Sequence, residues 1–321
     1  ADLNTGKTED GADNELRSQS SSEVKNYEVS RTVSSTVNPT NVIRKINAAV
    51  LVRERTIMDP ETGLLTISSR AASETQTFQI LLQLALITQD KLIEATLDFA
   101  RFHTEEARTI AKIGLANYYA GAALMPYGAF LQAARDSRHD LEILAHQFGA
   151  SIEQVAHRLS TMQRPGNKGL PFFFVRVDQA GTITKRHSAT RLQFARFGGA
   201  CPLWNVHRAF ETPGRFLRQL AETPDGVKYF CLARDVSKPG GSFGAPVRRF
   251  AIGLGCEVTH ADSLVYADGM DISAKGTFEP IGISCRICER AECHQRSVPP
   301  LERRLRIDEN ARGTLPYEVL K

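Results

Sequence analysis

The sequence predicts an α+β fold in which a helical region precedes a region of strands and short helices. Three observations carry this prediction. Between about residues 72 and 162, apolar residues recur at the spacing of a helix. From residue 170 onward, short runs rich in Phe, Val and Ile alternate with turns that contain Gly and Asp, a pattern typical of strands. All six cysteines lie after residue 200, which adds a cysteine-rich loop to the second region.

Length and composition indicate two or three domains. The chain has 321 residues, of which 42% are hydrophobic and 24% charged, so each domain can bury its own core. No apolar run reaches the roughly 18 residues that a membrane span needs, so we expect no membrane contact for residues 53–321. The net charge of +4 is spread along the chain and only weakly supports nucleic-acid binding. Because the chain opens on Ala1 and carries no signal peptide, we expect a fragment of a cytoplasmic protein.

The first 52 residues differ in character from the rest. Residues 1–24 are polar and are predicted to be a disordered tail. Residues 25–52 contain an Asn-Pro turn between β-rich runs and are predicted to form a β-hairpin. The sequence of this segment, KNYEVSRTVSSTVNPTNVIRKINAAVLV, resembles the periplasmic hairpin of flagellar M-ring proteins. Nothing after Val52 continues that pattern, so we interpret this hairpin as being of foreign origin and keep an M-ring fragment as an alternative function.

Residues 53–163 are predicted to be mainly helical. The stretch DPETGLLTISSR, from Asp59, favours a short strand pair around a Gly turn. Helices are expected over residues 72–102, 105–124, 127–148 and 152–162. The stretch FGASIEQVAHRLSTMQRPG across the last two has the spacing of a helix-turn-helix, and we keep it as an alternative DNA-reading element.

A turn-rich linker at residues 164–169 separates this region from residues 170–318. Beyond it, PFFFVRVDQAGTITKRHS predicts two strands joined by a turn at residues 178–181. The next segments predict a helix (PGRFLRQLAE), a strand (KYFCLARDV), and a strand followed by a short helix (RRFAIGLGCEVTHADSLVY). This order suggests a sensor domain of the GAF or PAS kind.

The strongest chemical pattern is Cys285, Cys288 and Cys293, spaced C-x2-C-x4-C. Two thiolates separated by two residues can face one centre, and a third closes most of a coordination shell. Zinc and an iron–sulfur cluster both fit, with reduced, unmetallated cysteines as the alternative. For the fourth ligand we favour Cys201, which follows a Gly pair that permits close backbone approach. Cys231 lies in an apolar strand pattern and suits core packing. Three nearby arginines would offset the negative charge of the thiolates: Arg286, Arg290 and Arg296. The other available ligands are Cys256, His207, His260 and His294.

The segment EEARTIAKIGLANYYAGAALMPYGAFLQAA resembles the helix that follows the metal-binding helix of the ImmA/IrrE metallopeptidases. In that family the preceding helix carries His-Glu-x-x-His, in which the imidazoles hold zinc and the Glu activates water. The aligned positions here are Leu82 and Leu86 for the histidines and Gln83 for the glutamate. Because Leu cannot bind a metal and Gln cannot act as a general base, we expect no enzymatic activity. A zinc metallopeptidase is kept as an alternative function.

Longer phrases, among them FARFGGACPLWNVHRAFETPGRFLRQLAE and PIGISCRICERAECHQRSVPPL, resemble the bacterial short-chain fatty acyl transcriptional regulators, the PrpR/RamB-like group, over residues 53–318. The resemblance implies a degenerate IrrE-like domain at 53–163 and a C-terminal sensor of short-chain acyl-CoA at 170–318. Such proteins control propionate and acetate metabolism. It also implies an iron–sulfur cluster on Cys285, Cys288 and Cys293, and DNA binding through a helix-turn-helix that this chain lacks. We expect a homo-oligomer.

An acyl-CoA ligand needs cations for its phosphates and an apolar slot for its acyl part. Four cations flank the aromatic residues of the predicted strands, and the alternative is a solvated basic face. The predicted ligand-binding residues are Arg176, Lys185, Arg186, Arg191, Phe174 and Phe194.

Overall fold

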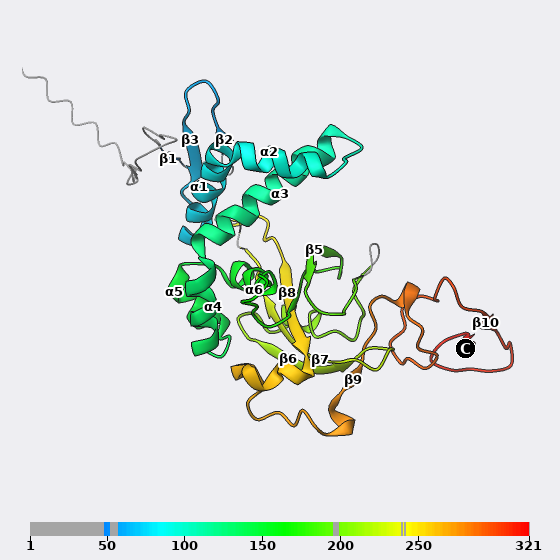
Figure 1. Ribbon diagram of the computed structural model, residues 1–321. Helices are drawn as coiled ribbons and strands as arrows, with labels where there is room; N and C mark the ends of the chain where they lie inside the picture. The colour runs from blue at the N-terminus through cyan, green and yellow to red at the C-terminus, as the bar shows by residue number, and fades with distance from the viewer. Residues whose placement is uncertain (1–47, 52–56, 195–198, 239, 241, 321) are drawn as a thin grey trace, which may run out of the picture.

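The computed structural model describes residues 48–51, 57–194, 199–238, 240 and 242–320 (Figure 1). The predicted tail at 1–24 and most of the predicted hairpin at 25–52 lie outside the described residues. The end of that hairpin segment is strand β1 (Ala48–Leu51), which pairs in parallel with β3 (Leu65–Ser68). Strand β2 (Ile57–Met58) pairs antiparallel with β3, which confirms a strand pair, although β2 lies just before the predicted start at Asp59. Gly63, at φ +67°, makes the turn between them.

Three helices follow: α1 (Ser73–Thr88), α2 (Asp90–Phe99) and α3 (Glu105–Leu124). The prediction of α3 is confirmed, whereas the single helix predicted at 72–102 is wrong. Gln89 leaves the helical conformation at ψ 12°, and Asp90 starts a new helix, where its negative charge suits the positive end of the helix dipole. The apolar periodicity runs through this break and therefore hid it.

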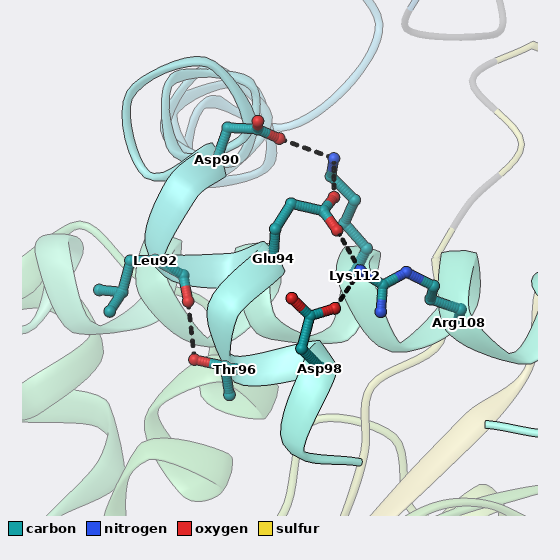
Figure 2. A network of polar contacts seen from close by, with 7 residues as sticks. All are labelled: Asp90, Leu92, Glu94, Thr96, Asp98, Arg108 and Lys112. Atoms are coloured by element: carbon teal, nitrogen blue, oxygen red, sulfur yellow. Dashed lines mark hydrogen bonds and ion pairs between the residues drawn. The ribbon is translucent and has the colours of Figure 1, made fainter. Parts of the chain in front are cut away.

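Helices α2 and α3 lie against each other and are joined by a network of ion pairs, which Figure 2 shows from close by. Lys112 lies 2.7 Å from Asp90 and 2.6 Å from Glu94. Arg108 lies 2.5 Å from Glu94 and 2.9 Å from Asp98. Exposed pairs contribute little to stability one by one, so the small buried cluster beneath them holds the helices together. That cluster consists of Ala85, Ile93, Leu97 and Ala116.

The second helical group is α4 (Tyr127–Asp136), α5 (Leu141–Phe148) and α6 (Ile152–Ser160). The single helix predicted at 127–148 is wrong, because Arg138 and His139 both adopt positive φ, at 49° and 62°. Asp140 then caps α5 by accepting from the backbone N–H of Glu142 and Ile143. The predicted helix at 152–162 is confirmed to within two residues.

A six-stranded sheet forms the second half of the molecule, in the order β5-β4-β8-β7-β6-β9. Neighbouring strands are antiparallel except β6 and β9. The strands are β4 (Phe173–Asp178), β5 (Ile183–Ser188), β6 (Leu217–Glu222), β7 (Lys228–Asp235), β8 (Phe250–Glu257) and β9 (Glu279–Pro280). A separate pair, β10 (Leu305–Arg306) and β11 (Glu318–Val319), lies near the C-terminus. The α+β prediction is confirmed.

The strands predicted around β4, β5, β7 and β8 are confirmed, but the helix predicted for PGRFLRQLAE is wrong, because this segment contains β6. Pairing with β7 over the whole length of β6 overrides the local helix-like spacing. The hairpin turn between them contains Asp225 and Gly226, with Gly226 at φ +79°. This Asp-Gly pair is the sequence feature that could have indicated a hairpin. The short helix predicted after β8 is the 3-10 segment Val258–Ser263.

Helices α4 to α6 cover one face of the sheet (Figure 1). Because successive strand residues point to opposite faces, Phe172 and Phe174 join the core with these helices, while Phe173 joins the core on the other face. There it packs against Trp204, with the ring centroids 5.9 Å apart. The residues buried from α6 include Val155, Ala156 and Leu159, so its apolar face belongs to the core and does not offer a free DNA-reading surface. In the part of the chain that the structure describes, no helix combines the length and apolar character of a bilayer span.

Candidate ligand groove and cysteine pocket

A groove of about 750 Å³ lies between the helices and the β4–β5 edge of the sheet. Leu82 and Gln83 line it, so the groove occupies the place where the aligned peptidase motif would hold its metal. The described lining residues include five cations and one acid. They are Arg158, Arg176, Lys185, Arg186 and Lys238, with Glu153.

Glu153 ties helix α6 to the sheet at this groove. Its Oε1 accepts from Arg176 Nη1 at 2.9 Å and from Lys185 Nζ at 2.8 Å. Burial alone would raise the pKa of the Glu153 carboxyl, but Lys185 and Arg176 outweigh burial and hold that pKa below its usual value. Arg176 is further oriented by Thr184, whose Oγ1 accepts from Nε at 2.9 Å, and it lies over the Phe250 ring.

Two more α6 side chains line the groove. Burial, with Lys185 nearby, lowers the pKa of His157 to about 4, so this ring is neutral at neutral pH. The ring meets Phe174 edge-on at 5.3 Å between centroids. Arg158 donates from Nε to the Met125 carbonyl at 3.1 Å, and its Nη1 is buried without a partner among the described residues.

The structure brings some of the predicted ligand residues together and separates others. Arg176, Lys185 and Arg186 line the groove, and Phe174 is buried beneath it against His157. Phe194 instead packs on Phe173 and Trp204 at the opposite face of the sheet. Arg191 does not line the groove, and its side chain is 80% exposed beside Glu257. Sequence reasoning missed Glu153, Arg158 and Lys238, although charged residues inside the otherwise apolar face of α6 were a usable signal for the first two.

The second site is a small pocket lined by Cys201, Cys285, Cys288 and Cys293. It therefore joins the predicted loop cysteines to the favoured distant one. The Gly282 N–H donates to Cys201 Sγ at 3.2 Å, and the Ser297 N–H donates to Cys285 Sγ at 3.5 Å. Burial raises the pKa of the Cys201 thiol, and the backbone N–H groups of Gly282 and Leu203 partly offset this rise.

The pocket suits a thiolate-bound group in three respects. A Cβ on Gly282 would lie 2.8 Å from Cys288 Sγ and 4.0 Å from Cys201 Sγ, so only glycine leaves room beside these sulfurs. The Nε of Arg296 is buried there without a partner among the described residues. Four cysteines are also the donor set of zinc and iron–sulfur sites. As placed, no group of three or more His, Cys, Asp or Glu side chains in the described ranges stands in metal-binding geometry.

The other two cysteines are buried elsewhere. Cys231 belongs to the core on one face of the sheet and Cys256 to the core on the other. Burial raises the pKa of Cys231 and raises that of Cys256 to about 12, which makes both thiols unreactive at neutral pH. The interpretation of Cys231 as a core residue agrees with this placement.

The fold therefore combines a helical domain that carries Leu82 and Gln83 at the aligned peptidase positions with an α+β domain that holds a cysteine pocket. Residues 161–317 match the family model for the C-terminal part of the short-chain fatty acyl coenzyme A regulators. Residues 42–160 match the model of the IrrE N-terminal-like domain. The chain belongs to the family of short-chain fatty acyl transcriptional regulators, the PrpR/RamB-like group, as the resemblance predicted.

Named relatives agree with this family. Over 264 residues the chain is 77% identical to the propionyl-CoA carboxylase regulator of Cereibacter sphaeroides, covering 82% of this chain and 57% of that protein. It is 46% identical over 258 residues to the HTH-type transcriptional regulator PrpR of Mycobacterium tuberculosis, covering 80% and 53%. A solved structure of a Mycobacterium tuberculosis transcriptional regulator matches with a TM-score of 0.79 and 44% identity, covering 85% of this chain and 84% of that one. The chain spans a little over half the length of the curated relatives. These names are those of regulators, which supports the prediction that the chain is not an enzyme.

Proposed function

We propose that this chain is the sensing part of a bacterial transcription regulator that binds a short-chain acyl-CoA in the groove and controls genes of propionate- or acetate-type carbon metabolism. The excess of cations in the groove carries this proposal, because CoA brings several phosphate charges that need them. Arg176, Lys185 and Arg186 stand on the sheet side, where they can meet phosphates.

The helix side of the groove supplies the apolar part of such a site. Phe78, Leu82 and Met125 line it, and Leu82 stands where the peptidase motif has a metal ligand. A leucine in place of a metal ligand removes peptidase chemistry and gives the groove an apolar wall that an acyl chain can contact. Peptide cleavage that a chelator abolishes would favour the peptidase alternative instead.

DNA binding is proposed for a helix-turn-helix outside this chain, and the whole protein is then expected to work in the bacterial cytoplasm. Regulators of this type usually bind two half-sites as symmetric dimers, so we expect a homo-oligomer. Size-exclusion chromatography with light scattering on the full-length protein tests this expectation.

Calorimetry with propionyl-CoA tests the groove. We expect binding by the wild type, and about tenfold weaker binding by Lys185→Ala, because one charge-assisted contact to a phosphate is lost. Arg191→Ala is the matched control, since this cation lies outside the groove and its loss should leave the Kd unchanged. No heat and no thermal shift with the wild type would overturn the proposal. Equal losses in both variants would mean that the ligand binds elsewhere.

We also infer that Cys201, Cys285, Cys288 and Cys293 hold an iron–sulfur cluster, with zinc as the alternative. When bound, such a group would cross-link the cysteine loop to the segment around Cys201 and could make the fold responsive to oxidants. An anaerobic absorption spectrum with metal and sulfide analysis distinguishes the two. Cys285→Ser should lower the metal content, whereas the control Cys231→Ser, in the core, should not. Equal metal content in both variants would argue against the site.

A further inference from the structure

We propose that Arg296 is the positioning residue and charge partner of the cysteine pocket, and this inference rests on the proposed thiolate-bound group there. The guanidinium of Arg296 donates hydrogen bonds to three backbone carbonyls of the cysteine loop. Its Nη1 donates to the Cys285 carbonyl at 3.1 Å. Its Nη2 donates to the carbonyls of Cys288, at 3.5 Å, and Arg290. One side chain thus ties together two of the ligand residues and the turn that follows them.

The charge of Arg296 is the second observation. The side chain lines the pocket, the residue is 6% exposed, and its Nε has no partner among the described residues. Within the described ranges its hydrogen bonds all go to backbone carbonyls, and no carboxylate there forms an ion pair with it. A buried cation without an acid is unfavourable unless another anion lies nearby. Four thiolates around a divalent metal or an iron–sulfur cluster carry a net negative charge and would be that anion.

The neighbouring arginines differ from Arg296, although Arg290 also lines the pocket and is half-buried. Arg290 donates to the carbonyls of Ile281, at 3.1 Å, and Glu222, and so anchors the loop to the sheet. Arg286 is exposed and does not line the pocket. Of the three arginines that the sequence placed near the cysteines, Arg296 is therefore the one that is buried at the sulfurs and also bonded to the backbone of their loop.

A guanidinium can donate to several carbonyls in fixed directions, whereas an ammonium is a point charge on a flexible stem. Arg296→Lys keeps the positive charge but loses the set of directed hydrogen bonds that the guanidinium makes to the carbonyls. Arg296→Gln loses the charge and keeps part of the hydrogen bonding. The two variants therefore separate charge compensation from positioning, and Arg286→Gln is the matched control for an arginine of the same loop.

The experiment uses the whole chain, reconstituted anaerobically with iron and sulfide or with zinc alone. We expect Arg296→Gln to weaken metal retention against a chelator by roughly 10- to 100-fold, the usual effect of losing an outer-shell partner. In a cluster-loaded protein, its reduction potential should become more negative, since a positive charge near the added electron is gone. Arg296→Lys should keep the wild-type potential and lose retention, and Arg286→Gln should match the wild type in both.

The outcomes separate this inference from the proposed cofactor. If the wild type retains neither iron nor zinc, the cofactor proposal fails and this inference fails with it. If the wild type is loaded and Arg296→Gln matches it in metal retention and potential, only the inference is overturned. Far-UV circular dichroism reports whether each variant is folded, and should Arg296→Gln fail to fold, retention and potential in Arg296→Lys decide.

Discussion

Glu153 on α6 and Arg176 on β4 form a partly buried ion pair, with 2.9 Å between Oε1 and Nη1. Several cations line this groove, and among the described lining residues the one acid is Glu153. Its carboxylate also forms an ion pair with Lys185. An anionic ligand bound in this groove, as proposed above, would compete with Glu153 for both cations. Such binding would couple the ligand to the contact between α6 and the sheet.

The first prediction concerns Glu153→Gln. Removing the carboxylate leaves Arg176 and Lys185 without their acid, so the variant should bind CoA several-fold more tightly than the wild type. It should also lose roughly 2 kcal/mol of folding stability at neutral pH, less than the full cost of breaking a buried pair because Lys185 is half exposed. Calorimetry and urea unfolding measure the two effects. Glu142→Gln, which removes an exposed partner of Arg234 outside the groove, is the control. Unchanged or weaker CoA binding by Glu153→Gln would contradict the proposed competition.

The second prediction concerns pH and His157. Its folded pKa of about 4 lies below the ordinary 6.5, so between these values the unfolded chain takes up a proton that the folded chain refuses. The contribution of His157 to stability is therefore complete above pH 6.5 and falls as the pH drops toward 4, by about 3 kcal/mol in total. Burial lowers this pKa most, Lys185, His187 and Arg158 lower it further, and Glu153 acts in the opposite direction.

His157→Phe should flatten the pH dependence of stability over that window, because a phenyl ring can pack on Phe174 without titrating. Urea unfolding of both proteins at a series of pH values gives the difference. The wild type and the variant share the lowered pKa values of His139 and His207, so the difference reports His157 together with its neighbour His187. Identical slopes would show that His157 titrates normally in the folded protein.

The third prediction concerns the packing of the central strand β8. A Cβ on Gly255 would overlap the Phe173 ring and lie 2.5 Å from the Phe230 carbonyl oxygen. Gly255→Ala should therefore destabilise the fold by about 1–3 kcal/mol. Gly128→Ala in α4 is the matched control, since nothing lies within 4 Å of its added Cβ, and there alanine should be neutral or stabilising. A Gly255→Ala protein as stable as the wild type in urea would mean that Phe173 repacks freely.

Local patterns predicted most of the secondary structure and failed where a break or a pairing partner decided the outcome. Apolar spacing located α3, but it did not show the break at Gln89, where the periodicity continues across a change of backbone direction. It also predicted a helix where β6 lies, because pairing with β7 overrides weak local preference. The Asp225-Gly226 turn was the local feature that pointed the other way.

The candidate sites show the same division. The spacing of Cys285, Cys288 and Cys293 is local, and so the loop site was predictable from the sequence. Whether Cys201 joins it depends on how the chain folds back over more than eighty residues, and the structure brings it to the same pocket. In the groove, Arg176 and Lys185 were predicted from their strands, but their acid partner comes from a helix.

The sequence by itself determined the class of fold and the cysteine loop, and it indicated Leu82, Gln83 and Leu86 at the aligned peptidase positions, because each depends on residue types at short, regular spacings. Only the tertiary structure decided which cations share the groove, that Phe194 lies on the opposite face of the sheet from Phe174, and that Arg296 is buried at the sulfurs. These features depend on which strand face a side chain occupies and on contacts between segments distant in the chain. Long-range packing settles both, and no local pattern encodes it.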